Sequence, residues 1–257
     1  MWAFRRKFFV FLFFLIIIVS IGIFIYFRFF NKNPTCFDGI KNAQEDGIDC
    51  GGSCKEVCLF QATDVNIFWA RTFQVVDGVS NTAALIENPN FDYRIEGIVS
   101  IKIYDEQNVR LIDFRKKISL GPSEKRLLFI PSINTGKPYP KKTFVNFEQV
   151  NSIVKDVVED NKILLISKRL EKDLNNLTRL NISMKNDDLL SKKNIEITAV
   201  LYDGEKEVLN VGKTFLDYMS KEEEKEVFIT WPNFIGNLEE VKETTVFIRL
   251  LKNEELF

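Results

Sequence analysis

The chain has 257 residues, a formal net charge of −1 and no histidine. The lack of histidine excludes Ser/His and Cys/His nucleophile pairs and the commonest zinc ligand, whereas acid–base chemistry through carboxylates stays open. Beyond residue 33 the sequence has 30 basic and 36 acidic residues, and this net charge of −6 provides no basic patch for a nucleic-acid partner.

Residues 8–27 are an uninterrupted apolar run, FFVFLFFLIIIVSIGIFIYF. As a helix, 20 residues rise ~30 Å, which is the thickness of the hydrocarbon core of a bilayer. A buried core helix is rarely apolar on every side, and a cleaved signal peptide ends in small residues that this run lacks. We therefore predict a cytoplasmic tail and a transmembrane signal anchor within residues 1–33.

The basic residues that flank this run predict its orientation. Arg5, Arg6 and Lys7 precede it, whereas Arg28 and Lys32 follow it. Positive charge is retained on the cytoplasmic side of a membrane. We expect a single-pass protein of the cell membrane with a cytoplasmic N-terminus and extracytoplasmic C-terminal domains.

A cysteine-rich stalk is predicted at residues 34–60. It contains all the cysteines of the chain, which are Cys36, Cys50, Cys54 and Cys58. A segment this short and poor in apolar residues needs cross-links or a metal to hold its shape. An even cysteine count outside the membrane favours two disulfides, and three pairings are possible. Zinc bound by the closely spaced cysteines is the alternative.

Four oxygen-bearing side chains between the first two cysteines are candidate calcium ligands: Asp38, Asn42, Glu45 and Asp49. Calcium prefers hard oxygen donors on a loop bent by glycines, although the spacing is not that of an EF-hand. The alternative is that these residues form turns and surface, because Asp-Gly is itself a turn signal. Calcium is thus the possible cofactor.

The stalk resembles a cysteine-rich motif of exported bacterial proteins, C-x-D-G-x-x-N-x-x-E-x-x-x-D-C-G-G-x-C-x-x-x-C. Residues 36–58 meet every fixed position of this pattern. The resemblance implies a surface-exposed, disulfide-bonded spacer beside β-rich modules, and no activity.

From residue 61 onward, alternating apolar and polar residues predict antiparallel strands, each with one buried and one wet face. The clearest runs end in Tyr-Asp, at residues 99–105 and 195–203, which are related by a shift of 98. Because 98 is even, Ile101 and Ile103 should face inward like Ala199 and Leu201. Further strands are predicted at residues 65–73, 82–89, 163–170 and 180–187, with a linker or one helical turn at 152–159. We expect a mainly β protein with two tandem β-sandwiches, at residues 61–150 and 151–257.

Each predicted copy resembles the FxLYD-type and late-embryogenesis-abundant-type Ig-like β-sandwiches of exported proteins. The matching residues include 86–90 (IENPN), 103–106 (IYDE) and 200–204 (VLYDG), with Asn186 in the second copy. Ile101 and Ala199 stand where that family has Phe. The resemblance implies non-catalytic Ig-like modules with a scaffold or binding role.

These features predict a membrane-anchored binding or scaffold protein of the cell envelope, not an enzyme, whose partner is a protein or an envelope polymer. A carboxylate-dependent extracytoplasmic hydrolase and a calcium-dependent adhesin are the alternatives. Trp69, Trp231 and Phe228 could line a ligand groove, but we expect them to pack in a core or against a sheet.

Overall fold

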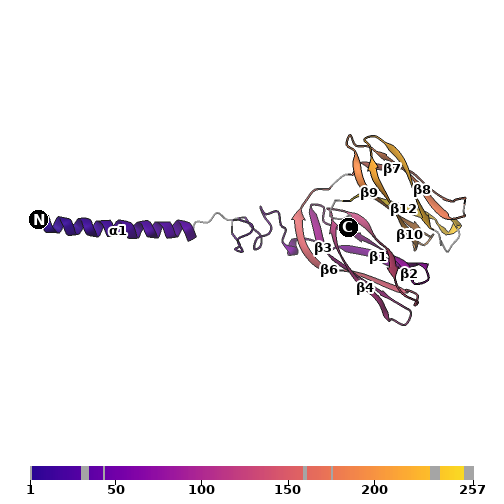
Figure 1. Ribbon diagram of the computed structural model, residues 1–257, viewed down its shortest axis with the longest axis horizontal. Helices are drawn as coiled ribbons and strands as arrows, with labels where there is room; N and C mark the ends of the chain where they lie inside the picture. The colour runs from indigo at the N-terminus through magenta and orange to yellow at the C-terminus, as the bar shows by residue number, and fades with distance from the viewer. Residues whose placement is uncertain are drawn as a thin grey trace. The chain divides into compact units, whose positions relative to one another are not determined.

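The fold is mainly β and contains one long helix. The computed structural model describes residues 2–29, 35–42, 44–158, 161–174, 176–231 and 238–251. The chain divides into two compact units, Met1–Cys58 and Leu59–Phe257 (Figure 1). The first contains helix α1 (Trp2–Phe29) and the cysteine segment, and the second contains the strands with two 3-10 turns, η1 (Leu59–Gln61) and η2 (Leu238–Glu240).

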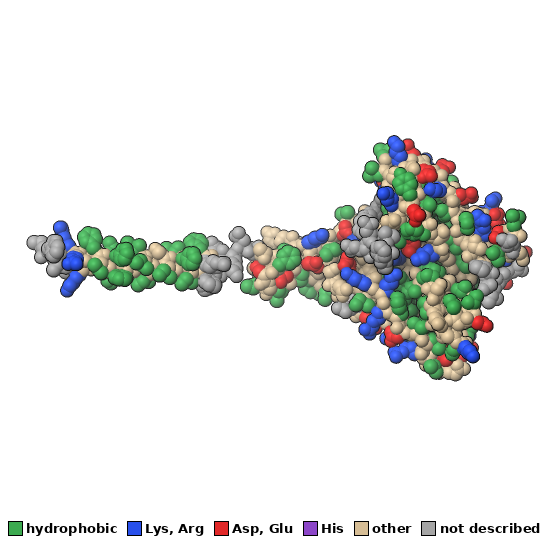
Figure 2. All heavy atoms as spheres, viewed as in Figure 1, with side chains coloured by type: hydrophobic (Ala, Val, Ile, Leu, Met, Phe, Trp, Pro, Cys, Tyr) green, Lys and Arg blue, Asp and Glu red, His purple; other side chains and the backbone are tan. Residues whose placement is uncertain are grey.

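Helix α1 is apolar on all sides. Its span Arg5–Phe27 has a mean hydropathy of 3.3 and is the one helix in the described part of the chain long and apolar enough to cross a membrane. Figure 2 shows hydrophobic side chains covering this helix, with basic side chains near its N-terminal end. A membrane anchor and a signal sequence share this length and composition. Of the following basic residues, Arg28 lies in α1 and Lys32 is outside the described residues.

The first sandwich consists of two antiparallel three-stranded sheets, with the strand orders β1-β2-β5 and β4-β3-β6. Its strands are β1 (Asn66–Val76), β2 (Val79–Glu87), β3 (Tyr93–Tyr104), β4 (Arg110–Leu120), β5 (Lys125–Asn134) and β6 (Lys142–Lys155). The buried core between the sheets contains Ala84, Ile86, Val99, Ile101, Ile103, Ile118, Leu120 and Leu128. Alternation along β3 therefore places its inward residues in one apolar layer.

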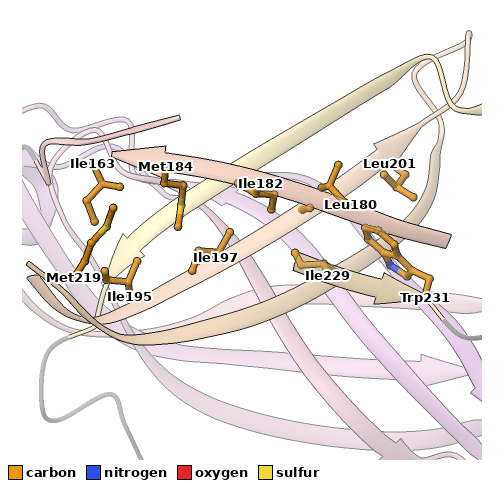
Figure 3. Packing of buried hydrophobic residues seen from close by; sticks show 11 residues of the cluster. Ile163, Leu180, Ile182, Met184, Ile195, Ile197, Leu201, Met219, Ile229 and Trp231 are labelled. Atoms are coloured by element: carbon orange, nitrogen blue, oxygen red, sulfur yellow. The ribbon is translucent and has the colours of Figure 1, made fainter. Parts of the chain in front are cut away.

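The second sandwich repeats this arrangement with the sheets β11-β8-β7 and β10-β9-β12. Its strands are β7 (Ile163–Lys172), β8 (Thr178–Asn186), β9 (Lys192–Tyr202), β10 (Val208–Met219), β11 (Glu224–Trp231) and β12 (Glu243–Leu250). Figure 3 shows its core, in which Trp231 lies at one end and Ile163 and Met219 at the other. Trp231 is held by an N–H···O bond of 2.8 Å to Val211 O. A Cβ on Gly212 would lie 2.4 Å from Ile229 and 2.9 Å from the Trp231 ring, so this close packing requires glycine.

The inward positions predicted from the sequence are confirmed. Ile101, Ile103, Ala199 and Leu201 are all buried in the two cores. Phe228, which we expected to pack in a core or against a sheet, is exposed. The Arg179 Cζ lies over its ring, 3.9 Å from the ring centroid. The common ancestry of the two sandwiches stays a prediction, although their strand orders correspond one for one.

Two buried asparagines make equivalent bonds in the two sandwiches. Asn88 Nδ2 donates to Tyr93 O (2.6 Å) and Gly121 O (2.8 Å), which joins the turn after β2 to the end of β4. Asn186 Nδ2 donates to Leu190 O (2.9 Å) and Ser220 O (2.8 Å) in the same manner. Both side chains are fully buried, where an amide must be hydrogen-bonded to be tolerated.

The boundaries predicted from the sequence differ from the observed ones at two points. Strand β6 extends to Lys155 because it pairs with β3 as far as Tyr93↔Lys155, so residue 150 lies inside a strand and 152–155 are not linker. The compact unit of the sandwiches begins at Leu59, two residues before the predicted start at 61, because the turn η1 begins there.

A substitution in the second core tests the fold. Ile197 is fully buried in β9, so Ile197→Ala leaves a cavity and should lower the free energy of unfolding by about 2–5 kcal/mol. Ile166→Ala in β7 is the matched control, because Ile166 is exposed and the same change should cost at most about 1 kcal/mol. Chemical denaturation of the full chain in detergent measures both values. Equal costs would contradict the assigned core.

Candidate functional site

The cysteine segment is closed by two interleaved disulfides. Cys36 pairs with Cys54 and Cys50 pairs with Cys58, and no described cysteine is free. The sequence left three pairings open, and the structure selects this one. All four sulfurs are therefore consumed in disulfides, which leaves no thiolates for the alternative of zinc.

The glycines of the Asp-Cys-Gly-Gly sequence are required by the backbone. Gly51 and Gly52 have positive φ angles of 77° and 52°, which side chains rarely adopt. A Cβ on Gly52 would lie 1.4 Å from Gln44 O, and one on Gly51 would lie 2.5 Å from Asp46 Oδ2. The Asp46 carboxylate also accepts the Gly52 N–H at 2.6 Å. Gly51 and Gly52 therefore let the backbone beside Cys50 pack closely against Gln44 and Asp46.

Three of the four predicted calcium ligands, Asp38, Glu45 and Asp49, accept hydrogen bonds within the segment, whereas the Asn42 amide donates one. Asp49 Oδ1 accepts the N–H groups of Asp38 (3.0 Å) and Gly39 (3.1 Å), which fastens the start of the loop to its end. Asp38 Oδ2 accepts Asn42 Nδ2 at 2.9 Å, and Glu45 Oε2 accepts Asn42 N at 3.2 Å. These bonds give each of the four side chains a structural role, and calcium binding by them stays a prediction.

One group of potential metal ligands lies in this segment. Ligand atoms of Cys36, Glu45 and Cys54 lie within 4.8 Å of one another. The two sulfurs form the Cys36–Cys54 disulfide and carry no thiolate charge, so the Glu45 carboxylate is the only anionic donor among the three.

The two sandwiches meet through an apolar cluster that the strand pattern did not anticipate. The outer face of the sheet β1-β2-β5 contributes Ala83 and Leu127, and the outer face of β10-β9-β12 contributes Val200, Val208 and Val211, all of them buried. Five partly buried side chains surround the cluster: Trp69, Phe73, Phe129, Tyr202 and Phe247. Trp69 thus packs at the junction between the sandwiches. Burial at this junction raises the pKa of the adjacent Tyr202.

Charged side chains join the sandwiches around this cluster. Arg249 on β12 donates from Nε to Glu124 Oε1 at 2.6 Å. Arg71 on β1 forms an ion pair with Glu207 and donates to Val208 O at 3.4 Å. The Lys213 Nζ lies 5.7 Å from the centroid of the Phe129 ring. The contact between the sandwiches therefore combines an apolar centre with a charged periphery.

A cavity of about 660 Å³, here called the arginine groove, opens between the sandwiches. Its cationic lining residues are Arg94, Lys125, Arg126, Lys192 and Arg249. Its acidic lining residues are Glu124 from the first sandwich and Glu196 from the second. Leu127 and Phe247 contribute apolar surface, so the groove is mainly charged and polar with a smaller apolar part.

Three guanidinium groups of this groove converge on one residue. Arg94 donates to Ser119 Oγ, while Arg126 and Arg249 both donate to Ser119 O, each over 3.4 Å. Arg94 and Arg126 are 9% and 8% exposed. Arg94 pairs with Asp156 at 2.5 Å. At the other wall, Lys192 bonds to Asp188 at 2.6 Å, and this bond lowers the pKa of Asp188.

A second cavity of about 350 Å³, here called the aromatic groove, opens beside the same cluster. Its aromatic lining residues are Phe68, Trp69, Tyr202 and Phe247, and Lys125, Lys206 and Glu243 contribute charge. Lys125 and Phe247 line both grooves. The Lys125 Nζ lies 4.2 Å from the centroid of the Phe68 ring, so this lysine is held at the boundary between them.

Sequence reasoning missed the arginine groove and named only Trp69 among the residues that line the aromatic groove, although one signal pointed to the junction. Residues 83–86 (AALI) and 199–201 (AVL) are continuously apolar rather than alternating. A continuous apolar run indicates a strand buried on both faces. The arginines had no such signal, because Arg94, Arg126 and Arg249 are far apart in the sequence.

No family model matches this chain, and no curated protein matches its sequence. A red sea bream transglutaminase aligns with 74% of this chain at 9% identity and a TM-score of 0.22. A β-glucuronidase of glycoside hydrolase family 2 aligns with 79% of it at 12% identity and a TM-score of 0.19. The chain spans 31% and 25% of these two proteins, and likenesses this weak say nothing about its activity.

The positive-φ glycines lead to a prediction for the cysteine segment. Gly52→Ala would drive a methyl group into Gln44 O, so the segment must rearrange and the yield of the Cys36–Cys54 and Cys50–Cys58 pairs should fall. Gly39→Ala is the matched control, because Gly39 has a similar φ of 73° but nothing within 4 Å of its Cβ position. Non-reducing peptide mapping measures the pairing. Native pairing in Gly52→Ala would refute the argument.

Calcium titration tests the four candidate ligands. If Asp38, Asn42, Glu45 and Asp49 bind calcium, isothermal titration of the full chain in detergent should give a saturable heat that Asp49→Asn abolishes. Asp77→Asn, at an exposed acidic residue on the turn between β1 and β2, is the control and should leave that heat unchanged. Absence of binding at millimolar calcium, the range of weak extracellular sites, would leave these residues with their structural bonds alone.

Proposed function

We propose that this chain is a single-pass membrane protein that presents two Ig-like sandwiches outside the cytoplasmic membrane, where they bind a protein or an envelope polymer. The observation that carries the proposal is the order of the structural elements along the chain. An apolar helix of 28 residues is followed by a segment closed by two disulfides and then by the strands.

The membrane anchor is supported by the composition of α1. None of the span Arg5–Phe27 is buried within the protein, and leaving so many Phe, Ile and Leu side chains in water would be costly. A bilayer removes that cost. Disulfides persist in oxidising compartments, so Cys36–Cys54 and Cys50–Cys58 support an extracytoplasmic location for the part that follows α1. Arg5, Arg6 and Lys7 support a cytoplasmic N-terminus.

The Ig-like character is supported by the connections between the strands. In each sandwich the first, second and fifth strands share one sheet, and the fourth, third and sixth share the other. The chain thus crosses between the sheets after its second, fourth and fifth strands, as in Greek-key sandwiches. The FxLYD-type resemblance of the sequence belongs to the same proposal.

A binding role is favoured over catalysis by the state of the carboxylates. The hydrolase alternative has one observation behind it, since Glu124 and Glu196 line the same groove from different sandwiches. However, Glu124 contacts Arg249 at 2.6 Å and also accepts the Gly121 N–H at 2.7 Å. Glu196 contacts Lys213 at 3.1 Å. Both carboxylates thus hold the protein's own groups together, which suits a rigid binding surface.

Protease accessibility tests the proposed topology. Protease added to intact bacterial spheroplasts should digest residues 59–257, because they lie outside, and should leave the N-terminal tail intact. Replacing Arg5, Arg6 and Lys7 by Gln should increase the protected fraction, because the positive charge that retains the tail is gone. Immunoblots against a tag at each end report the digestion.

The control removes the same number of charges far from the helix, at exposed Lys137, Lys221 and Lys242. It should leave accessibility unchanged. Protection of residues 59–257 in the unmodified protein, lost only when detergent is added, would show that the proposed orientation is wrong. Release of the sandwiches in soluble form would show that α1 is a cleaved signal.

A further inference from the structure

We propose that the arginine groove is a binding site for a phosphate group, carried as a monoester by its ligand. The site is built where the two sandwiches meet, from β3 and β5 of the first and from β9 and β12 of the second. The proposal concerns ligand chemistry and does not depend on which side of a membrane the sandwiches lie.

The charge of the groove favours an anion. Its described lining has five cationic and two acidic side chains, an excess of three positive charges. Asp156, Asp188 and Lys213, which contact lining residues, reduce this excess to two. The acidic residues Glu159 and Asp160, which follow the lining residue Val158 in the sequence, lie outside the described part of the chain and are not included in this sum. Like charges on low-dielectric walls repel one another, and a bound anion offsets that repulsion.

The arrangement of the arginines favours phosphate over carboxylate. The guanidinium groups of Arg94, Arg126 and Arg249 line the groove from two sandwiches and also contact Ser119, which does not line it. Each guanidinium presents a planar fork of N–H donors, which matches a pair of phosphate oxygens. A carboxylate has only two oxygens to share among three forks, whereas a phosphate monoester has three non-ester oxygens.

The groove is large enough for more than an inorganic ion. Its volume of about 660 Å³ lies within the range of sites for small organic ligands. Ser123, Asn161 and Thr198 add neutral polar groups to the lining, and Leu127 and Phe247 add apolar surface. These groups suit a phosphorylated sugar or polyol, whose body combines hydroxyl groups with apolar faces.

The burial of the arginines is maintained by contacts that do not involve a ligand. Arg94 is fixed by Asp156 and Arg249 by Glu124. Side chains fixed in this way lose little further entropy when a ligand binds, which favours affinity. The phosphate site is therefore largely formed before binding.

Calorimetric titration of the full chain in non-ionic detergent tests the proposal. We expect saturable binding of glycerol phosphate, weaker binding of inorganic phosphate, and no saturation by acetate at equal ionic strength. Glycerophosphoglycerol, a diester, separates a lipid-headgroup ligand from a monoester. Saturation by acetate and phosphate alike would overturn the preference for phosphate, and no saturation by any phosphate compound at tens of millimolar would overturn the site.

Two variants with opposite expected effects on affinity test whether phosphate binds in this groove. Arg126→Gln should weaken glycerol phosphate binding by about 10- to 100-fold, the usual worth of charge-assisted hydrogen bonds. Glu196→Gln removes an anionic lining residue and should tighten binding several-fold. A purely structural role for either residue would change thermal stability without this opposite pair of effects.

The matched control is Arg115→Gln. Arg115 lies on β4, is exposed and does not line the groove, so its replacement should leave the affinity unchanged. If Arg126→Gln does not fold, Lys192→Gln tests the opposite wall of the same groove, with folding checked by circular dichroism. Equal affinities for the wild type, a folded groove variant and Arg115→Gln would show that phosphate binds elsewhere.

Discussion

The apolar contact between the two sandwiches determines the geometry of the arginine groove and the aromatic groove. Ala83 and Leu127 on one sheet pack against Val200, Val208 and Val211 on the other, which removes two sheet faces from water. Both grooves border this contact and are lined from both sandwiches. A sandwich alone would carry only half of each groove, so docking of the sandwiches and formation of the sites are one event.

Charged side chains surround this contact and are absent from its apolar cluster, because burying a charge is costly. The centre is apolar, whereas the charged pairs lie at the edge: Arg71–Glu207 is about half exposed and Arg249–Glu124 is mostly buried. Buried ion pairs add little net stability, because desolvation offsets their attraction. They do fix the relative orientation of the two sheets, since an unpaired buried charge would be more costly still. Here that orientation brings Arg249 beside Arg94 and Arg126.

The cysteine segment is stabilised in a different way from the sandwiches. It has too few apolar residues for a core, and its shape depends on two interleaved disulfides and on carboxylates that accept backbone N–H groups. Asp46 and Asp49 act as internal acceptors, so Asp49, a candidate calcium ligand, also has a local structural role. A cross-linked segment of this kind resists unfolding without large buried area, which suits a spacer.

The sequence alone determined the features that follow from local pattern: the apolar helix, the alternation that buries Ile103 and Leu201, and the equivalent turn asparagines, Asn88 and Asn186. Each depends on residues close together in the chain, where periodicity and turn chemistry act directly. The disulfide pairing, the end of β6 at Lys155 and the joining of Arg94, Arg126 and Arg249 were decided only by the tertiary structure. These depend on which sheet faces meet, and a strand apolar on both faces shows that it has a partner without showing which one.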